Sequence, residues 1–99
     1  MLRHIVAWNF KEGFTDEQNR ENALKVKSEL ESLINHIDGL VEIRVFIDQL
    51  PSSTRNIVLN SLLRDEEALA VYQAHPEHQR VAAFVASVTR DRVCVDYLE

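Results

Sequence analysis

Three side chains suited to proton transfer or hydrogen bonding, Tyr72, His75 and His78, occur within a stretch of seven residues. Imidazoles titrate near neutral pH, and a phenol both donates and accepts hydrogen bonds. On one continuous helix Tyr72 and His78 would point to different sides, because six residues at about 3.6 per turn make one full turn and about two thirds of another. Pro76 disfavours helical geometry at His75 and suits the first position of a new helix. The spacing therefore predicts a broken helix that directs Tyr72 and His78 into one space.

The remaining sequence predicts the elements that must position these residues. In chain order they are a strand from Leu2 to Phe10, a helix that begins after Thr15 and ends near Asp38-Gly39, strands from Leu40 to Ile47 and from Asn56 to Leu63, a helix from Asp65 to His75, a further helix after Pro76, and a strand from Asp91 to Leu98. The two segments on either side of Pro76 form one broken helical element. The order is then β-α-β-β-α-β, which predicts the ferredoxin-like α+β fold: a four-stranded antiparallel sheet with its helices on one face.

Local signals mark the helix boundaries. Thr15 and Gln18 fit a capping box, Asp65 can cap the second helix, and Gly39 can take the left-handed conformation that ends the first. Three- and four-residue steps predict the buried stripe of the first helix. Its predicted members are Ala23, Leu24, Leu30, Leu33, Ile34 and Ile37.

The first and last strands carry apolar residues on both faces, yet helices can cover only one face of the sheet. A chain of 99 residues has nothing left to shield the other face, so a partner sheet is the simplest cover. We therefore expect a homodimer closed sheet against sheet, a dimeric α/β barrel. The first and last strands are antiparallel neighbours in this topology. We expect His4 to pair with Asp96, which also places Val6 beside Cys94 and Leu2 beside Leu98.

Composition excludes several classes of function. No shift in composition divides residues 1–99, so one domain is expected, and the net charge of −5 without a basic cluster argues against nucleic acid as a partner. No apolar run approaches the length of a membrane span, and we expect a cytoplasmic protein with no membrane partner. Two glycines, Gly13 and Gly39, form no nucleotide-binding loop. The single cysteine, Cys94, is expected to be a small buried residue and not a nucleophile.

Several stretches together resemble the stress-responsive dimeric α/β-barrel (Dabb) family, over essentially the whole chain. They are Arg3-His4-Ile5-Val6, Lys11-Glu12-Gly13, Asp65-Glu66-Glu67-Ala68, the Tyr72-x-x-His75-Pro76-x-His78 signature and Val95-Asp96-Tyr97. The family includes a plant polyketide cyclase that makes olivetolic acid. The resemblance implies that residues at the positions of Tyr72 and His78 carry catalysis in that enzyme.

This resemblance suggests a chemistry that needs no metal or other cofactor. An aldol cyclisation begins when a base removes a proton between two carbonyl groups and a donor stabilises the enolate oxygen. In this hypothesis His78 is the base, Tyr72 the donor, and Asp96 holds the His78 imidazole in the useful tautomer. His4 supports the same network, and His75 and Trp8 join it in contacting a small apolar or carbonyl ligand.

Plainer interpretations remain open. His75 and Pro76 can simply end a helix, Tyr72 can be an ordinary core residue, and His4 can be a satisfied buried histidine. His75 and His78 lack a third ligand for a metal. Three classes of function therefore stand side by side: a cofactor-free enzyme acting on a carbonyl compound, a binding protein for a small apolar molecule, and a structural assembly.

The aromatic residues of the sequence are compatible with a hydrophobic ligand cavity and with a plain core. The aromatic residues that could line it fall at ordinary core spacing; they are Trp8, Phe10, Phe14, Phe46 and Phe84. The first helix offers Ala23, Leu24 and Lys27 where large aromatic side chains would be expected to hold an alkyl tail. The substrate of the plant cyclase is therefore not carried over to this chain.

Overall fold

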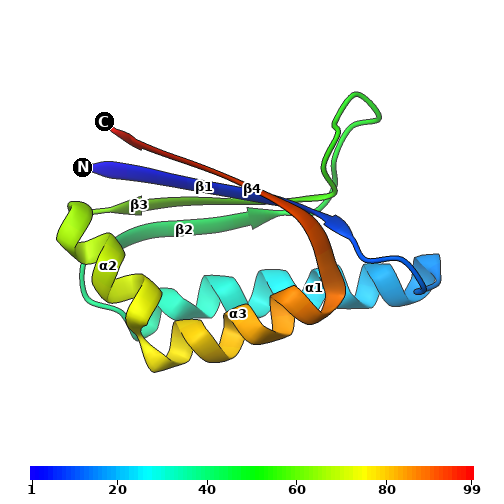
Figure 1. Cartoon of the computed structure of the whole chain (residues 1–99), viewed down its shortest axis with the longest axis horizontal. Helices are drawn as coiled ribbons and strands as arrows, with labels where there is room; N and C mark the ends of the chain where they lie inside the picture. The colour runs from blue at the N-terminus through cyan, green and yellow to red at the C-terminus, as the bar shows by residue number, and fades with distance from the viewer.

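A computed structural model describes all residues, 1–99, and shows one sheet with helices packed on a single face (Figure 1). The elements are β1 (Leu2–Phe10), α1 (Asp16–Glu31), the 3-10 helix η1 (Ser32–Asn35), β2 (Leu40–Phe46), β3 (Ile57–Leu63), α2 (Glu66–Ala74), α3 (Pro76–Val88) and β4 (Thr89–Leu98). The predicted ferredoxin-like order of elements is confirmed. None of the helices is both long enough and apolar enough to cross a membrane.

The four strands lie in the order β2-β3-β1-β4, and each neighbouring pair is antiparallel. The first and last strands of the chain are therefore adjacent, with β1 inside the sheet and β4 at its edge. The predicted pairing is confirmed: His4 lies opposite Asp96, Val6 opposite Cys94 and Leu2 opposite Leu98. Alternation then places these six side chains on the face that the helices occupy.

The helix boundaries follow the local signals. The Thr15 hydroxyl accepts from the Gln18 backbone while the Gln18 side chain accepts from the Thr15 backbone, and Asp65 caps α2 through the Ala68 N–H. Between α2 and α3, His75 adopts extended geometry and Pro76 is the first residue of α3. The predicted break is confirmed, and it arises because proline restricts the residue before it.

The buried stripe of the first helix differs from the prediction. Leu24 is 48% exposed and Ile34 is 39% exposed, whereas Val26 is completely buried. The α-helix stops at Glu31 and continues as η1, which changes the turn and rotates the side chains that follow. The predicted turn at Gly39 is confirmed by its φ of +87°.

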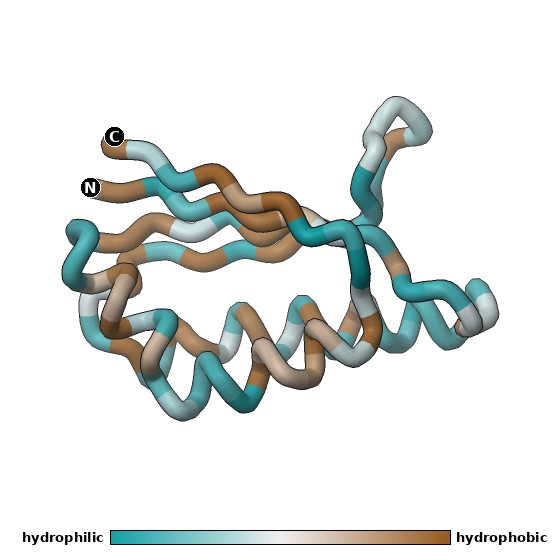
Figure 2. Tube along the Cα trace, viewed as in Figure 1, coloured by the Kyte–Doolittle hydropathy of each residue, from teal (hydrophilic) through white to brown (hydrophobic).

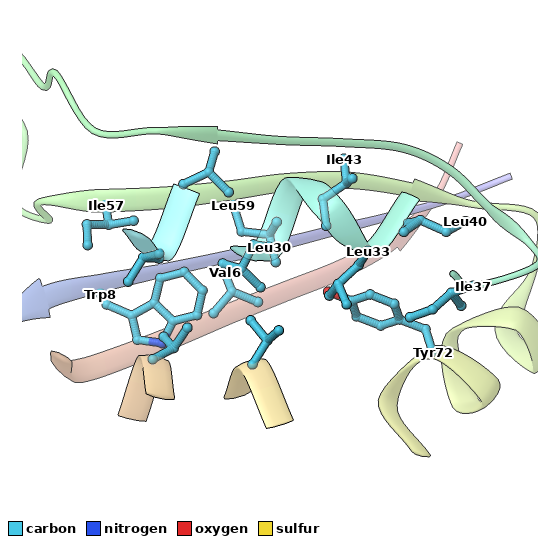
Figure 3. Close-up of a cluster of buried hydrophobic side chains, with 14 of the residues drawn as sticks. Val6, Trp8, Leu30, Leu33, Ile37, Leu40, Ile43, Ile57, Leu59 and Tyr72 are labelled. Carbon is cyan, nitrogen blue, oxygen red and sulfur yellow. The ribbon is translucent and has the colours of Figure 1, made fainter. Parts of the chain in front are cut away.

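The core lies between the sheet and the helices and contains 19 buried apolar residues. Figure 3 shows Tyr72 extending from α2 into this cluster beside Leu33, while Val6 and Trp8 project from β1. The strand side chains on this face of β1 are almost wholly buried, including that of His4. The core is therefore where the candidate site residues of β1 and α2 meet.

The opposite sheet face has no helix over it (Figure 1), and apolar residues recur along the strands of the sheet (Figure 2). In β4, Val93 is 43% exposed, Val95 56% and Tyr97 46%. We call this face the outer apolar patch; it comprises Ile5, Ala7, Val58, Val93, Val95 and Tyr97. Contiguous exposed apolar surface of this kind is typical of an interaction site.

Candidate functional site

A cavity of about 260 Å³ lies between the sheet and the helices. Side chains from β1, α1, β3, α2, α3 and β4 line it: His4, Val6, Trp8, Leu30, Leu59, Tyr72, His78, Ala82, Val85, Ala86 and Arg92. Most of these are hydrophobic, and the polar ones are few, as in most small-molecule sites. The cavity thus gathers four of the six residues that the sequence singled out for the site.

Tyr72 is fully buried, because α2 places it on the side that faces the sheet. Its hydroxyl has no hydrogen-bond partner within the protein. Burial raises the pKa of the Tyr72 phenol well above 10, so the group stays protonated at neutral pH. A protonated phenol inside an apolar cavity is available to donate a hydrogen bond to a ligand.

His78 faces Tyr72 from the first turns of α3, and their ring centroids are 4.4 Å apart. Its Nδ1 is buried without a hydrogen-bond partner. Burial lowers the pKa of His78 below its ordinary value of 6.5, an effect that the backbone of Gln73 offsets only in part. The imidazole is therefore neutral at pH 7 and has a nitrogen lone pair that can accept a proton. The break at Pro76 is what allows Tyr72 and His78 to share one space.

Asp96 binds His4 and not His78, so the predicted Asp96 role is corrected. The Asp96 carboxylate contacts Nδ1 of His4 in a short hydrogen bond across the β1–β4 pair. The two strands determine this contact, because directly opposed residues have neighbouring side chains. The bond engages Nδ1 and leaves Nε2 of the buried His4 for another partner. His4 is thus the imidazole that a carboxylate orients, in the way that histidine bases are usually held.

His75 does not line the cavity, contrary to the expectation that it contacts a ligand. Its Nδ1 accepts a hydrogen bond from the backbone N–H of Glu77 at 3.1 Å, which caps the start of α3. Free backbone N–H groups at a helix start require such acceptors. His75 therefore helps to place His78 without touching the cavity itself.

Of the five aromatic residues considered for the cavity wall, only Trp8 lines it. Phe14 and Phe46 are exposed on the surface. The first helix contributes only Leu30, and α3 contributes the small residues Ala82 and Ala86. The small side chains of Ala82 and Ala86 leave room beneath the sheet that larger residues at these positions would fill.

Arg92 lines the cavity from β4 and was not predicted. The available signal was the alternation of the last strand, since Arg92 lies two and four residues before Cys94 and Asp96, which were placed on the inner face. Its charge opposes the rise in the pKa of Tyr72 that burial causes, and it adds to the lowering of the pKa of His78. Both effects are those expected of a positive charge on the cavity wall.

Comparison with known families agrees with this geometry. Residues 2–99 match the model of the stress responsive A/B barrel domain, Dabb. The chain belongs to this family. No curated protein matches the sequence of this stress-responsive barrel protein.

Several solved structures resemble this chain over nearly its whole length. A dimeric ferredoxin-like protein of unknown function from Bacteroides fragilis is 28% identical with a TM-score of 0.89, covering 97% of this chain and 93% of its own. A dimeric ferredoxin-like protein of unknown function from Thermobifida fusca is 24% identical, with a TM-score of 0.84 and coverage of 99% and 90%. A hydroxynitrile lyase from Passiflora edulis is 15% identical, with a TM-score of 0.80 and coverage of 97% and 90%. The last two show a shared fold.

The barrel domain also brings His4, Cys94 and Asp96 together, with one ligand-type atom of each within 4.8 Å of the others. Cys94 is exposed and not buried as expected, because no helix covers the edge strand β4. Burial and the carboxylate of Asp96 nevertheless raise the pKa of its thiol, which disfavours the thiolate that a metal or a nucleophilic role requires. These three residues are the set that could hold a cation, and the raised pKa of the Cys94 thiol and the bond between His4 and Asp96 oppose it.

Proposed function

We propose that this protein is a homodimer in which the outer apolar patches of two copies pack against each other. The exposed side chains of β4 carry the proposal, since Val93, Val95 and Tyr97 form an apolar surface on one protomer. The similar proteins from Bacteroides fragilis and Thermobifida fusca are described as dimeric. A two-fold arrangement buries the same patch on both copies, which is the usual solution for such a surface.

We further propose that the cavity binds a small, mainly apolar carbonyl compound. The observation that carries this proposal is the Tyr72 hydroxyl, which is buried in the cavity without a partner in the protein. A buried hydroxyl without a hydrogen bond destabilises a protein, and a carbonyl oxygen is an acceptor that would satisfy it. The volume of about 260 Å³ is below the range of about 300–1,000 Å³ for drug-sized ligands. The ligand is then about the size of one substituted ring.

The polar groups also support a cofactor-free reaction at the carbon next to that carbonyl. A neutral imidazole removes a proton from the carbon, and the electron pair moves to the carbonyl oxygen, where the Tyr72 hydroxyl stabilises the enolate. His78 is neutral and adjacent to Tyr72, while His4 is oriented by Asp96, so either can be the base. The enolate can then attack a second carbonyl, as in aldol cyclisation. The lyase from Passiflora edulis is an enzyme with the same fold.

Acetophenone tests both ligand binding and proton removal, because it is a small aromatic ketone with exchangeable protons next to its carbonyl. Binding is measured from the indole NMR signal of Trp8, the only tryptophan, which lines the cavity. Proton removal is measured as deuterium incorporation into the methyl group in heavy water. We expect binding and exchange in the wild type, with exchange reduced about 100-fold or more in a base variant, His78→Gln or His4→Gln.

His36→Gln is the matched control, because His36 is exposed and does not line the cavity. It should leave both binding and exchange unchanged. Binding without exchange above the rate in His78→Gln and His4→Gln would make the protein a binder of carbonyl compounds and not an enzyme. If acetophenone neither shifts the Trp8 signal nor exchanges its protons, the cavity proposal is wrong and a structural assembly is the better interpretation.

A further inference from the structure

The ionisable groups that line the cavity are unusual for a protein with a net charge of −5. They are the guanidinium of Arg92, the imidazoles of His4 and His78, and the phenol of Tyr72; no aspartate or glutamate is among the lining residues. Arg92 is the lining residue that is always charged, and the apolar wall beside it strengthens the attraction of its guanidinium for an anion. The end of the cavity at Arg92 therefore favours an anion.

Arg92 has no acidic partner within the protomer. Arg44, Arg55 and Arg92 are the arginines that form no ion pair, and only Arg92 among them lines the cavity. On the same strand, by contrast, Arg90 lies 2.8 Å from Glu12 and 3.7 Å from Asp91. The acid nearest to Arg92 on the inner side of β4 is Asp96, which is already bonded to His4.

The cavity has a charged end and an uncharged end. Arg92 and Ala86 are exposed and lie where the cavity meets solvent, whereas Tyr72 is fully buried and has a free hydroxyl. Val6, Leu30 and Leu59 form apolar wall. Guanidinium groups bind carboxylates through two parallel hydrogen bonds, which gives both strength and orientation.

We propose that the cavity selects small oxo acids, with the ligand carboxylate bound by Arg92 at the open end and its carbonyl oxygen bound by Tyr72 at the buried end. This inference rests on the proposed carbonyl-binding function and adds the charge of the ligand to it. Arg92 is then a specificity-determining residue: it contacts the carboxylate and leaves the chemistry at the carbonyl to the residues around Tyr72.

The test compares two probes of the same shape, 4-acetylbenzoate and the neutral 4-acetylbenzamide, which keep the ketone of acetophenone. Dissociation constants are measured from the indole signal of Trp8 for the wild type, Arg92→Gln and Arg90→Gln. The charge-assisted pair should make the acid bind about 10- to 100-fold more tightly than the amide in the wild type. Arg92→Gln should remove that preference and leave the affinity for the amide within about threefold. Arg90→Gln removes the same charge from the same strand outside the cavity and should keep the preference.

The outcomes separate this inference from the proposal beneath it. Equal affinities for the acid and the amide in the wild type, or a preference that survives Arg92→Gln, would overturn the assignment of Arg92 while carbonyl binding stands. A preference lost equally in Arg90→Gln would show only a long-range effect of charge and would also overturn it. If neither probe nor acetophenone binds, both the inference and the carbonyl-binding proposal fail.

Discussion

The hydroxyl of Tyr72 opposes folding and serves ligand binding, so removing it should separate stability from function. The group is fully buried and has no hydrogen-bond partner in the protein. Burying a hydroxyl without a partner costs about 1–3 kcal/mol in proteins, and water entering a cavity of this size moves the cost towards the lower value. Tyr72→Phe keeps the ring and deletes the hydroxyl. It should therefore raise the free energy of unfolding by about 1 kcal/mol, or the Tm by roughly 4–8 °C for a domain of this size.

Urea unfolding followed by circular dichroism measures this change, with wild type and variant at equal protomer concentration because dimerisation contributes to stability. The same Tyr72→Phe protein should lose affinity for acetophenone. Tyr97→Phe is the matched control, since Tyr97 is the other tyrosine, lies on the outer face and is half exposed. It should leave the affinity for acetophenone unchanged, because Tyr97 lies in the outer apolar patch and does not line the cavity. A Tyr72→Phe protein less stable than the wild type by about 1 kcal/mol or more would refute the reasoning, because the hydroxyl would then be satisfied in the folded state.

Three further predictions concern pH, assembly and the backbone. Burial lowers the pKa of His78, so the unfolded chain binds a proton that the folded chain does not as pH falls below about 6.5. The free energy of unfolding should therefore decline below that pH, and His78→Phe should make the decline smaller. Urea unfolding at pH 7 and pH 5.5 measures the decline, and an equal decline in the wild type and in His78→Phe contradicts the prediction. Val95→Asp places a charge in the outer apolar patch of both copies and should raise the dimer dissociation constant roughly 100-fold in sedimentation experiments. Val71→Asp changes a similarly exposed helix position and should leave that constant unchanged. A Val95→Asp dimer as tight as the wild type argues against sheet-to-sheet packing. Gly39→Ala should lower the free energy of unfolding by about 2 kcal/mol or more, because the left-handed φ is combined with a contact of 2.8 Å between the new Cβ and the Cβ of Ala68. Gly13→Ala should lower it by only about 1 kcal/mol, since φ is left-handed there too but the space is open. Equal losses in thermal unfolding would show that the contact with Ala68 relaxes freely.

Features that depend on neighbours in the chain could be predicted from the sequence. The capping box at Thr15, the break at Pro76 and the span of the first strand are such features, because each arises from the geometry of a few adjacent residues. The pairing of His4 with Asp96 follows as well, once the order of elements makes the first and last strands neighbours. The fold, and the position of Tyr72 and His78 beside each other, could therefore be predicted from the sequence.

The sequence did not predict which side chains contact each other or which side of the first helix faces the sheet. Periodicity indicated Leu24 in the buried stripe, but the sheet lies on the side of Val26, and only packing decides which side of a weakly amphipathic helix is covered. The partner of Asp96 also depends on packing. Its backbone pairing with His4 was predicted, but only the packed side chains show that its carboxylate contacts His4 and not His78.

Local geometry and alternation are enough to predict the order of elements, the pairing of the first strand with the last and the groups able to do chemistry. Packing, in contrast, determines that a cavity remains beneath the sheet, that Arg92 lines it and that His75 lies outside it. A cavity is the space left when elements distant in sequence pack, so no local pattern reveals it. Its existence depends on side chains such as Ala82 and Ala86 being too small to fill the gap between α3 and the sheet.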